Sequence, residues 1–237
     1  MGKSLIQQAR GKGGPVYRSR SFAFAGAIKM HAETTELLIG EITDLIHCPG
    51  HSAPLMQITY ADKKEVLLPA PEFVRIGDNV TSGTGSEVNP GNAMKLRDIP
   101  EGTPVYNIEL QPGDGGKFCR TSGSAARLLA KTENHALVQL PSKKEKTFNL
   151  DCRAIIGVIS GGGRTEKPML KAGVKHFNRR AKNKRWPNPT GAAQNAVDHP
   201  FGNKRTSRKA KQKAVSHFAP PGRKVGKLWP RRTGRKK

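Results

Sequence analysis

The hydrophobic positions along the middle of the chain recur mostly with a period of two residues, which indicates short β-strands rather than helices. Residues 55–60 place Met56, Ile58 and Tyr60 on one face. A polar turn follows, and residues 65–69 return as the second arm of a hairpin. This stretch of sequence therefore predicts an antiparallel pair of strands.

Two further segments extend this first set of strands. Residues 36–42 are typical of a strand despite their acids, and residues 76–80 form a tight turn that enters another short strand. Four or five short strands within roughly 50 residues are typical of a small barrel of the OB type.

A second series of strands follows a linker at residues 81–92, which is rich in Gly, Ser, Thr and Asn. Residues 154–159 complete the series as a buried closing strand. The alternating apolar positions of this series are Tyr106, Ile108, Leu110, Ala136, Val138, Leu140, Phe148 and Leu150. We therefore expect two small β-barrels in tandem, with no long helix.

The charge of the chain is segregated into its ends. The net charge is +24, but residues 31–160 carry 13 bases and 16 acids. Residues 1–30 carry six bases and no acid, and residues 161–237 carry 23 bases and two acids. A near-neutral body is thus flanked by two basic extensions, which indicates a polyanionic partner.

Neither extension has the apolar pattern of an independent core. Such a segment cannot offset the entropy of ordering its chain, so we expect the C-terminal extension to fold only against a polyanion. In the N-terminal extension, Gly11 and the glycines that follow are expected to break any helix or strand. Arg18 and Arg20 alternate with aromatic residues there, a mixture that suits RNA, although a merely disordered arm is the alternative.

The sequence contains no stretch of ~20 apolar residues that would span a bilayer, and its N-terminus lacks the apolar core of a signal peptide. Its three cysteines, Cys48, Cys119 and Cys152, are widely spaced, which is typical of reduced thiols in a cytosol. We expect a soluble intracellular protein.

Four segments resemble one known family, and they occur in the family's order. They are residues 92–103 (NAMKLRDIPEGT), 109–117 (ELQPGDGGK), 151–157 (DCRAIIG) and 195–200 (NAVDHP). On these segments the chain resembles the universal large-subunit ribosomal protein two family. His199-Pro200-Phe201-Gly202 is similar to its archaeal or eukaryotic-like members, whereas bacterial members typically have His-Pro-His-Gly.

The resemblance implies a mainly β fold, with an OB-like barrel followed by an SH3-like barrel and long irregular basic extensions at both ends. The domains expected on this basis are a basic N-terminal extension at residues 1–33, the OB-like barrel at 34–82, the SH3-like barrel at 83–160 and a basic RNA-binding C-terminal extension at 161–237.

The resemblance also implies a structural, non-enzymatic component of the large ribosomal subunit in the cytoplasm. The expected partners are large-subunit rRNA, other ribosomal proteins, nearby tRNA ends and the small subunit at the interface, with no membrane. The protein would support subunit association, tRNA placement and organisation of the peptidyl-transferase region. No cofactor is expected, and Mg²⁺ would enter only as part of the bound RNA.

The candidate RNA-binding residues are basic or aromatic side chains of the two extensions, together with the loop at residues 195–199. They are Lys3, Arg10, Lys12, Arg18, Arg20, Arg164, Lys167, Lys171, Lys175, His176, Arg179, Arg180, Lys182, Lys184, Arg185, Trp186, Asn195, Asp198, His199, Lys204, Arg205, Arg208, Lys209, Lys211, Lys213, Arg223, Lys224, Arg231 and Arg232.

Two side-chain groups admit a second interpretation. His199 has the chemistry of a general base and could assist peptidyl transfer, but we favour hydrogen bonding to RNA and packing of its loop. His47, Cys48 and His51 are three potential zinc ligands; no second pair accompanies them, so we expect a surface turn and no metal. A free basic nucleic-acid chaperone is the remaining alternative for the whole chain.

Overall fold

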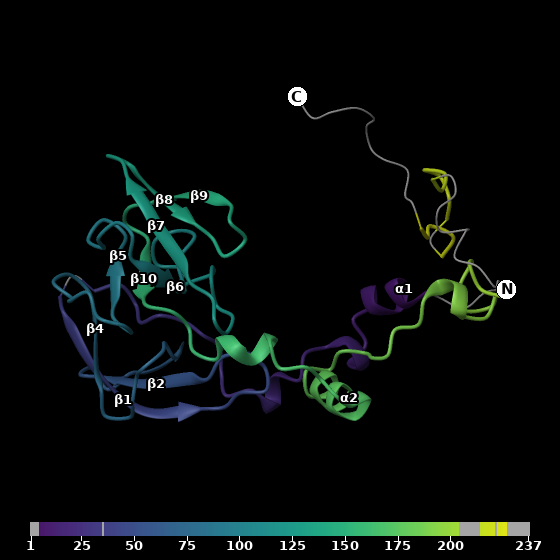
Figure 1. Cartoon of the computed structure of the whole chain (residues 1–237), viewed down its shortest axis with the longest axis horizontal. Coiled ribbons are helices and arrows are strands. Elements are labelled where there is room, and N and C mark those ends of the chain that lie inside the picture. Colours follow the sequence, from purple (N-terminus) through teal and green to yellow (C-terminus); the bar gives the residue numbers. More distant parts are fainter. Residues whose placement is uncertain (1–4, 35, 204–213, 221, 227–237) are drawn as a thin grey trace. The chain divides into compact units, whose positions relative to one another are not determined.

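A computed structural model describes residues 5–34, 36–203, 214–220 and 222–226, and the protein is mainly β, as predicted (Figure 1). The chain divides into two compact units. Residues 21–170 form the sheet unit, which holds all the strands, and residues 1–20 and 171–237 form the basic unit. None of the helices in these described residues is long and apolar enough to cross a membrane.

The strands of the sheet unit follow one another with short connections. They are β1 (Leu38–Ile46), β2 (Leu55–Tyr60), β3 (Glu65–Pro69), β4 (Asn79–Ser82), β5 (Ala93–Lys95), β6 (Pro104–Tyr106), β7 (Ala126–Lys131), β8 (His135–Gln139), β9 (Glu145–Asn149) and β10 (Arg153–Ile156). Their hydrogen-bonded order is β3-β2-β1-β4-β5-β10-β6-β7-β8-β9. The β4–β5 pair is parallel, through Ser82 and Ala93, and the other pairs are antiparallel.

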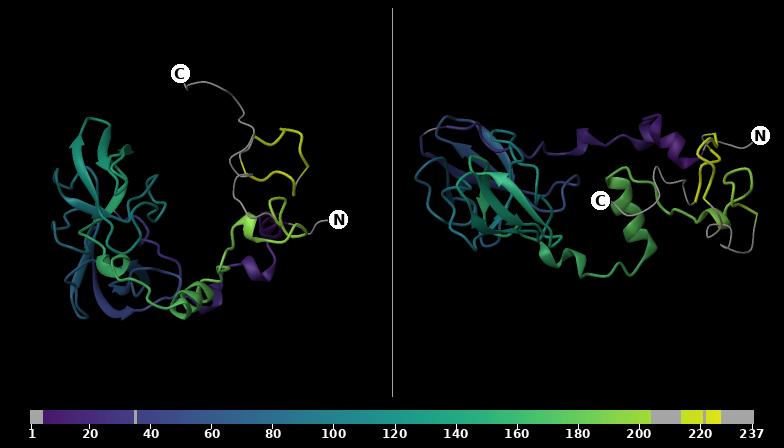
Figure 2. Two further views of the ribbon diagram at one scale, coloured as in Figure 1. Left: turned by 45° about the vertical axis from the view of Figure 1, so that its right-hand side comes forward. Right: turned by 90° about the horizontal axis from the view of Figure 1, so that it is seen from above.

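The strands of the sheet unit are drawn as arrows in the ribbon views of Figure 2. The buried apolar side chains of this unit form two hydrophobic cores. The first is built around Ile42, Leu55 and Ile58, and the second around Leu96 and Leu128, all of them fully buried. Each core therefore excludes water from the apolar face of its own strands, which is the main stabilising contribution to such small barrels.

Residues from outside the first strand group complete the first core. Ile28 and Met30 precede β1, in the segment expected to be a basic extension, yet they are 6 % and 4 % exposed. Tyr106 comes from β6, and its hydroxyl donates to the carbonyl of Pro69 over 3.1 Å. The domain boundaries proposed from the sequence stay a prediction. The first core, however, contains residues from three of the four proposed domains.

The hairpin prediction is confirmed by β2 and β3, in which Met56, Ile58 and Tyr60 are buried. β1 runs from Leu38 to Ile46, beyond its expected end at residue 42. Sequence analysis missed β7, whose sequence ARLLAK consists of good helix formers. Burial of its alternate side chains in the second core outweighs that local preference.

The continuous strand expected around residues 106–110 is wrong. β6 ends at Tyr106 because Asn107 has a φ of 48°, outside the extended region. Asn107 and Glu109, which alternate in sequence with the apolar positions 106, 108 and 110, are both fully buried. The buried strand expected at residues 154–159 is confirmed by β10, which is buried along its length but ends at Ile156; it pairs with β5 on one side and β6 on the other.

The basic extensions are not irregular throughout, which corrects the prediction. Helix α1 (Ile6–Gly11) ends at the first of the glycines that were expected to break any helix, and helix α2 (Ala172–Ala181) lies in the C-terminal extension. The α2 sequence contains no proline and is rich in Ala, Lys and Arg, which are good helix formers. Short 3₁₀ turns occur at Pro15–Tyr17, Ser21–Ala23, Gly162–Thr165 and Gly191–Ala193.

Candidate nucleic-acid interface

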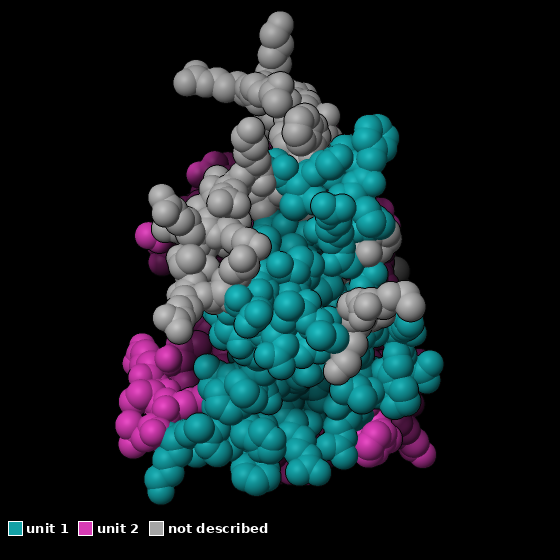
Figure 3. Space-filling view, turned by 90° about the vertical axis from the view of Figure 1, so that its right-hand side faces the viewer, with its two compact units in different colours: residues 1–20, 171–237 teal, residues 21–170 magenta. Residues whose placement is uncertain are grey.

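The two ends of the chain form a single basic unit, which the sequence did not reveal (Figure 3, teal). Its sequence carries 26 lysines and arginines and one acid, Asp198, whereas the sheet unit carries 16 bases and 17 acids. The net positive charge of the protein therefore belongs to the unit built from its ends, because the charges of the sheet unit almost cancel. A polyanion bound there would release its counterions, which favours association at low salt.

Helix α2 presents several of the predicted cations to solvent. None of its residues is buried, and Arg179 and Arg180 lie in its last turn. Cations at that end interact favourably with the helix dipole, and planar guanidinium groups can bind phosphate through two hydrogen bonds. Lys175 lies over the indole ring of Trp186, with Nζ 5.6 Å from the ring centroid.

Asn183 connects the two ends of the chain. It follows α2 with a φ of 49°, a left-handed conformation that Asn tolerates better than most residues. Its side-chain nitrogen Nδ2 donates to the backbone carbonyl of Pro15 over 2.9 Å and to that of Arg18 over 2.6 Å. These bonds hold the N-terminal extension against the residues after α2.

A cavity of about 260 Å³ opens at this junction. Val16 and Trp186 contribute apolar surface to it, and Arg180, Lys184 and Arg185 contribute positive charge. An aromatic ring beside cations is the combination that binds single-stranded RNA, because bases stack on the ring while phosphates pair with the cations. Sequence reasoning missed Val16 and Asn183. An Asn just after a helix-forming stretch is the sequence signal that could have found Asn183, because Asn is common where a helix ends in a left-handed residue.

The loop at residues 195–203 is the second feature of the basic unit. The backbone N–H groups of Asp198 and His199 both donate to the carbonyl of Asn195, and that of Gly202 donates to the carbonyl of His199. The N–H of Phe201 donates to Nδ1 of His199 over 3.1 Å. Because Nδ1 accepts this bond, the neutral imidazole carries its proton on Nε2.

The imidazole of His199 is half-buried against Gly191. A Cβ atom at position 191 would overlap the ring, so only glycine leaves room for it. A cavity of about 210 Å³ lies beside this ring, lined also by Leu5 and Ile6 of the N-terminal extension and by Val225. His199 is thus a packed residue whose Nδ1 is already engaged within the protein.

The remaining predicted residues are distributed unevenly. Arg164 and Lys167 belong to the sheet unit. The Nε of Arg164 donates to the hydroxyl of Ser122 over 2.8 Å. In the basic unit, the Nε of Arg18 donates to the carbonyl of Gly13 over 2.9 Å, and Arg10 lies in the last turn of α1. The following predicted residues lie outside the described residues: Lys3, Lys204, Arg205, Arg208, Lys209, Lys211, Lys213, Arg231 and Arg232.

The turn at residues 47–51 belongs to the sheet unit. Cys48 is 1 % exposed, and its Sγ lies 3.1 Å from Nδ1 of His51. In the part of the chain that the structure describes, no group of three or more His, Cys, Asp or Glu side chains is arranged to hold a metal ion. The cysteines at 48, 119 and 152 are free thiols.

Comparison with known proteins matches one family along nearly the whole chain. The family model described as Ribosomal Proteins L2, C-terminal domain, matches residues 89–219. The large ribosomal subunit protein uL2 of Natronomonas pharaonis is 46 % identical over 236 residues, which cover 99 % of this chain and 97 % of that protein. The protein of the same name from Methanothermobacter thermautotrophicus is 46 % identical over 241 residues, covering all of both chains. That from Methanopyrus kandleri is 44 % identical over 239 residues, covering 99 % and 98 %.

Proposed function

The chain belongs to the uL2 family of structural proteins of the large ribosomal subunit, and we propose that its basic unit binds large-subunit rRNA. The observation that carries this proposal is the joining of both chain ends into one unit with 26 bases and one acid. That unit also presents the cavity beside Trp186, where a base could stack among Arg180, Lys184 and Arg185.

The basic unit has little apolar interior of its own. Leu5 and Val225 are the buried apolar residues among its described positions. Burial of two side chains contributes about 3–6 kcal/mol, far less than the entropy of ordering this many residues costs. We therefore propose that rRNA supplies the missing stabilisation, and that Mg²⁺ enters the site only as part of that RNA.

For the loop at residues 195–203 we propose a positioning role near tRNA ends and the peptidyl-transferase region, within a cytoplasmic ribosome. This placement rests on the resemblance of residues 195–200 to a segment of the ribosomal protein family. The packing of His199 on Gly191, with Nδ1 engaged by Phe201, supports positioning over chemistry. Association with the small subunit belongs to the same proposal.

Sedimentation of a native lysate tests the proposal, with the chain followed through the gradient. We expect the chain to co-migrate with the large subunit, to remain there through a high-salt wash and to leave it after ribonuclease digestion. Release into light fractions by salt alone would contradict the proposal and would favour a free nucleic-acid chaperone.

Two substitutions test the role of the loop. His199→Ala removes the imidazole, and Gly191→Ala displaces it while leaving it in the chain. If His199 acts by packing, both variants will impair assembly of the large subunit. If instead His199→Ala particles assemble fully, bind tRNA and form peptide bonds slowly, the imidazole takes part in the chemistry.

A further inference from the structure

The loop between β3 and β4 carries an exposed aromatic residue in a strained conformation. The side chain of Phe73 is 94 % exposed, and its backbone φ is 71°. The left-handed region crowds a Cβ atom, so a bulky residue there is unusual, and glycine would fit without strain. With 94 % of its surface exposed, Phe73 contributes little to the packing of the described residues.

The loop itself is firmly attached to the sheet unit. The N–H of Glu72 donates to the carbonyl of Val158 over 2.9 Å, and that of Gly77 donates to the carbonyl of Ile42 over 2.8 Å. Val74 packs against the first core. Phe73 is therefore exposed because its neighbour packs inward while the left-handed backbone directs the ring outward.

The charges close to Phe73 along the chain are mainly negative. Within residues 71–79, Glu72 and Asp78 carry negative charge and Arg75 carries positive charge. Asn79, at the end of this loop, pairs with Glu41 of β1, which is exposed. Three carboxylates with one guanidinium repel a phosphate backbone, which disfavours RNA as the occupant.

We propose that this surface docks a basic, partly apolar segment of another protein of the large subunit. We define the Phe73 surface as Phe73 and Ile76, which is 60 % exposed, together with Glu72 and Asp78 of the same loop and Glu41, which pairs with Asn79 at the end of the loop. An exposed aromatic ring supplies the apolar anchor of an interface, and complementary charges at its rim fix orientation and partner. The proposal rests on the function proposed above.

A photo-crosslinking experiment in the full chain identifies the occupant. The variant Phe73→p-benzoylphenylalanine is expressed in cells, large subunits are isolated and irradiated, and the crosslinked partner is identified by mass spectrometry. We expect a crosslink to a protein segment that contains both lysine or arginine and apolar residues. A crosslink to RNA, a crosslink to an acidic segment, or no crosslink would overturn the proposal.

A matched pair of glycine variants tests whether the Phe73 ring anchors that partner. Phe73→Gly and Lys63→Gly both relieve a left-handed residue, since Lys63 has a φ of 63° in the exposed turn between β2 and β3. We expect neither variant to lower Tm. Phe73→Gly should reduce retention of the crosslinked protein in salt-washed subunits severalfold, whereas Lys63→Gly should not.

Equal retention of the crosslinked protein in both variants would contradict the role of Phe73.

The docking proposal and the function proposed above fail in different ways in these experiments. If the parent chain itself is missing from the large-subunit fraction, the function proposed above fails; if the chain is present but the Phe73 variant behaves like the parent, only the docking proposal fails.

Discussion

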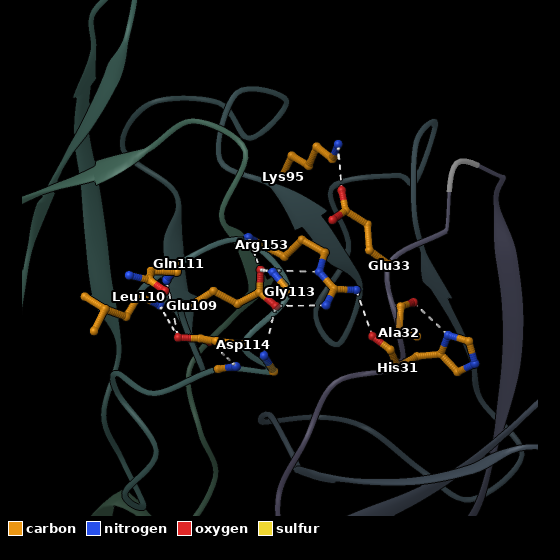
Figure 4. A network of polar contacts seen from close by, with 12 residues as sticks. His31, Ala32, Glu33, Lys95, Glu109, Leu110, Gln111, Gly113, Asp114 and Arg153 are labelled. Carbon is orange, nitrogen blue, oxygen red and sulfur yellow. Dashed lines mark hydrogen bonds and ion pairs between the residues drawn. The ribbon is translucent and has the colours of Figure 1, made fainter.

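The guanidinium of Arg153 and the carboxylate of Glu109 form an ion pair closed off from solvent, with 2.8 Å between Nη2 and Oε1 (Figure 4). Their side chains are 5 % and 0 % exposed. Glu109 also accepts hydrogen bonds from the backbone N–H groups of Gly113 and Gly115, and Nη1 of Arg153 donates to the carbonyl of His31. The pair thus joins β10 to two loops of the sheet unit.

We predict that Arg153→Met destabilises the protein by about 3–5 kcal/mol, because it leaves the Glu109 carboxylate buried without its cation. Denaturant unfolding of the isolated protein measures the change. The control is Lys95→Met, which breaks the partly exposed pair between Lys95 and Glu33 and should cost at most about 1 kcal/mol. Similar losses in both variants would mean that burial of the Arg153 pair has no special effect.

A second prediction concerns stability in acid. The hydrogen bond from Lys64 lowers the pKa of Asp62 from 3.8 to about 2, with a further contribution from His31. A carboxyl whose pKa is lower in the folded state stabilises the protein above its unfolded pKa, and this contribution is lost as the pH falls. Asp62→Asn should therefore flatten the dependence of Tm on pH between 3.8 and about 2.

The Tm of parent and variant measured across that pH range checks this prediction. Parallel curves, separated by a constant offset, would show that the ionisation of Asp62 does not contribute. Below pH 2 the Tm of the variant should differ little from that of the parent, because the Asp62 carboxyl is then protonated in both the folded and the unfolded chain.

The third prediction concerns salt and RNA binding. If Arg179 and Arg180 each contact one phosphate, replacing both by Gln should reduce the slope of log Kd against log salt by about 0.7–0.9 per contact. Lys143→Gln with Lys144→Gln is the control, because it removes the same charge from an exposed turn of the sheet unit. Titration with large-subunit RNA at several salt concentrations measures the slope for both double variants. An equal change of slope in the two would argue against binding localised at α2.

The fourth prediction concerns the thiols. Burial raises the pKa values of Cys119 and Cys152 to about 11, and Cys48 is 1 % exposed. Because the thiolate is the reactive form, a disulfide reagent at neutral pH should label the native protein slowly and the unfolded protein at once. Labelling followed by absorbance checks this, and rapid reaction of a native thiol would contradict it.

The local sequence pattern predicted those features of the fold that depend only on residues close together in the chain. The hairpin of β2 and β3, the alternation in β8 and the basic composition of both ends could be predicted because each lies in one short stretch of chain. β7 could not, since its helix-forming residues become a strand through contacts with distant residues of the second core.

The candidate site divides in the same way. The sequence by itself determined the family, the mainly β class and the segregation of charge, because composition and motif order need no coordinates. Only the tertiary structure decided that the two chain ends form one unit through Asn183, that Glu109 faces Arg153, and that Phe73 points outward. Each of these depends on backbone conformation or on residues far apart in sequence, and a sequence pattern cannot specify such contacts.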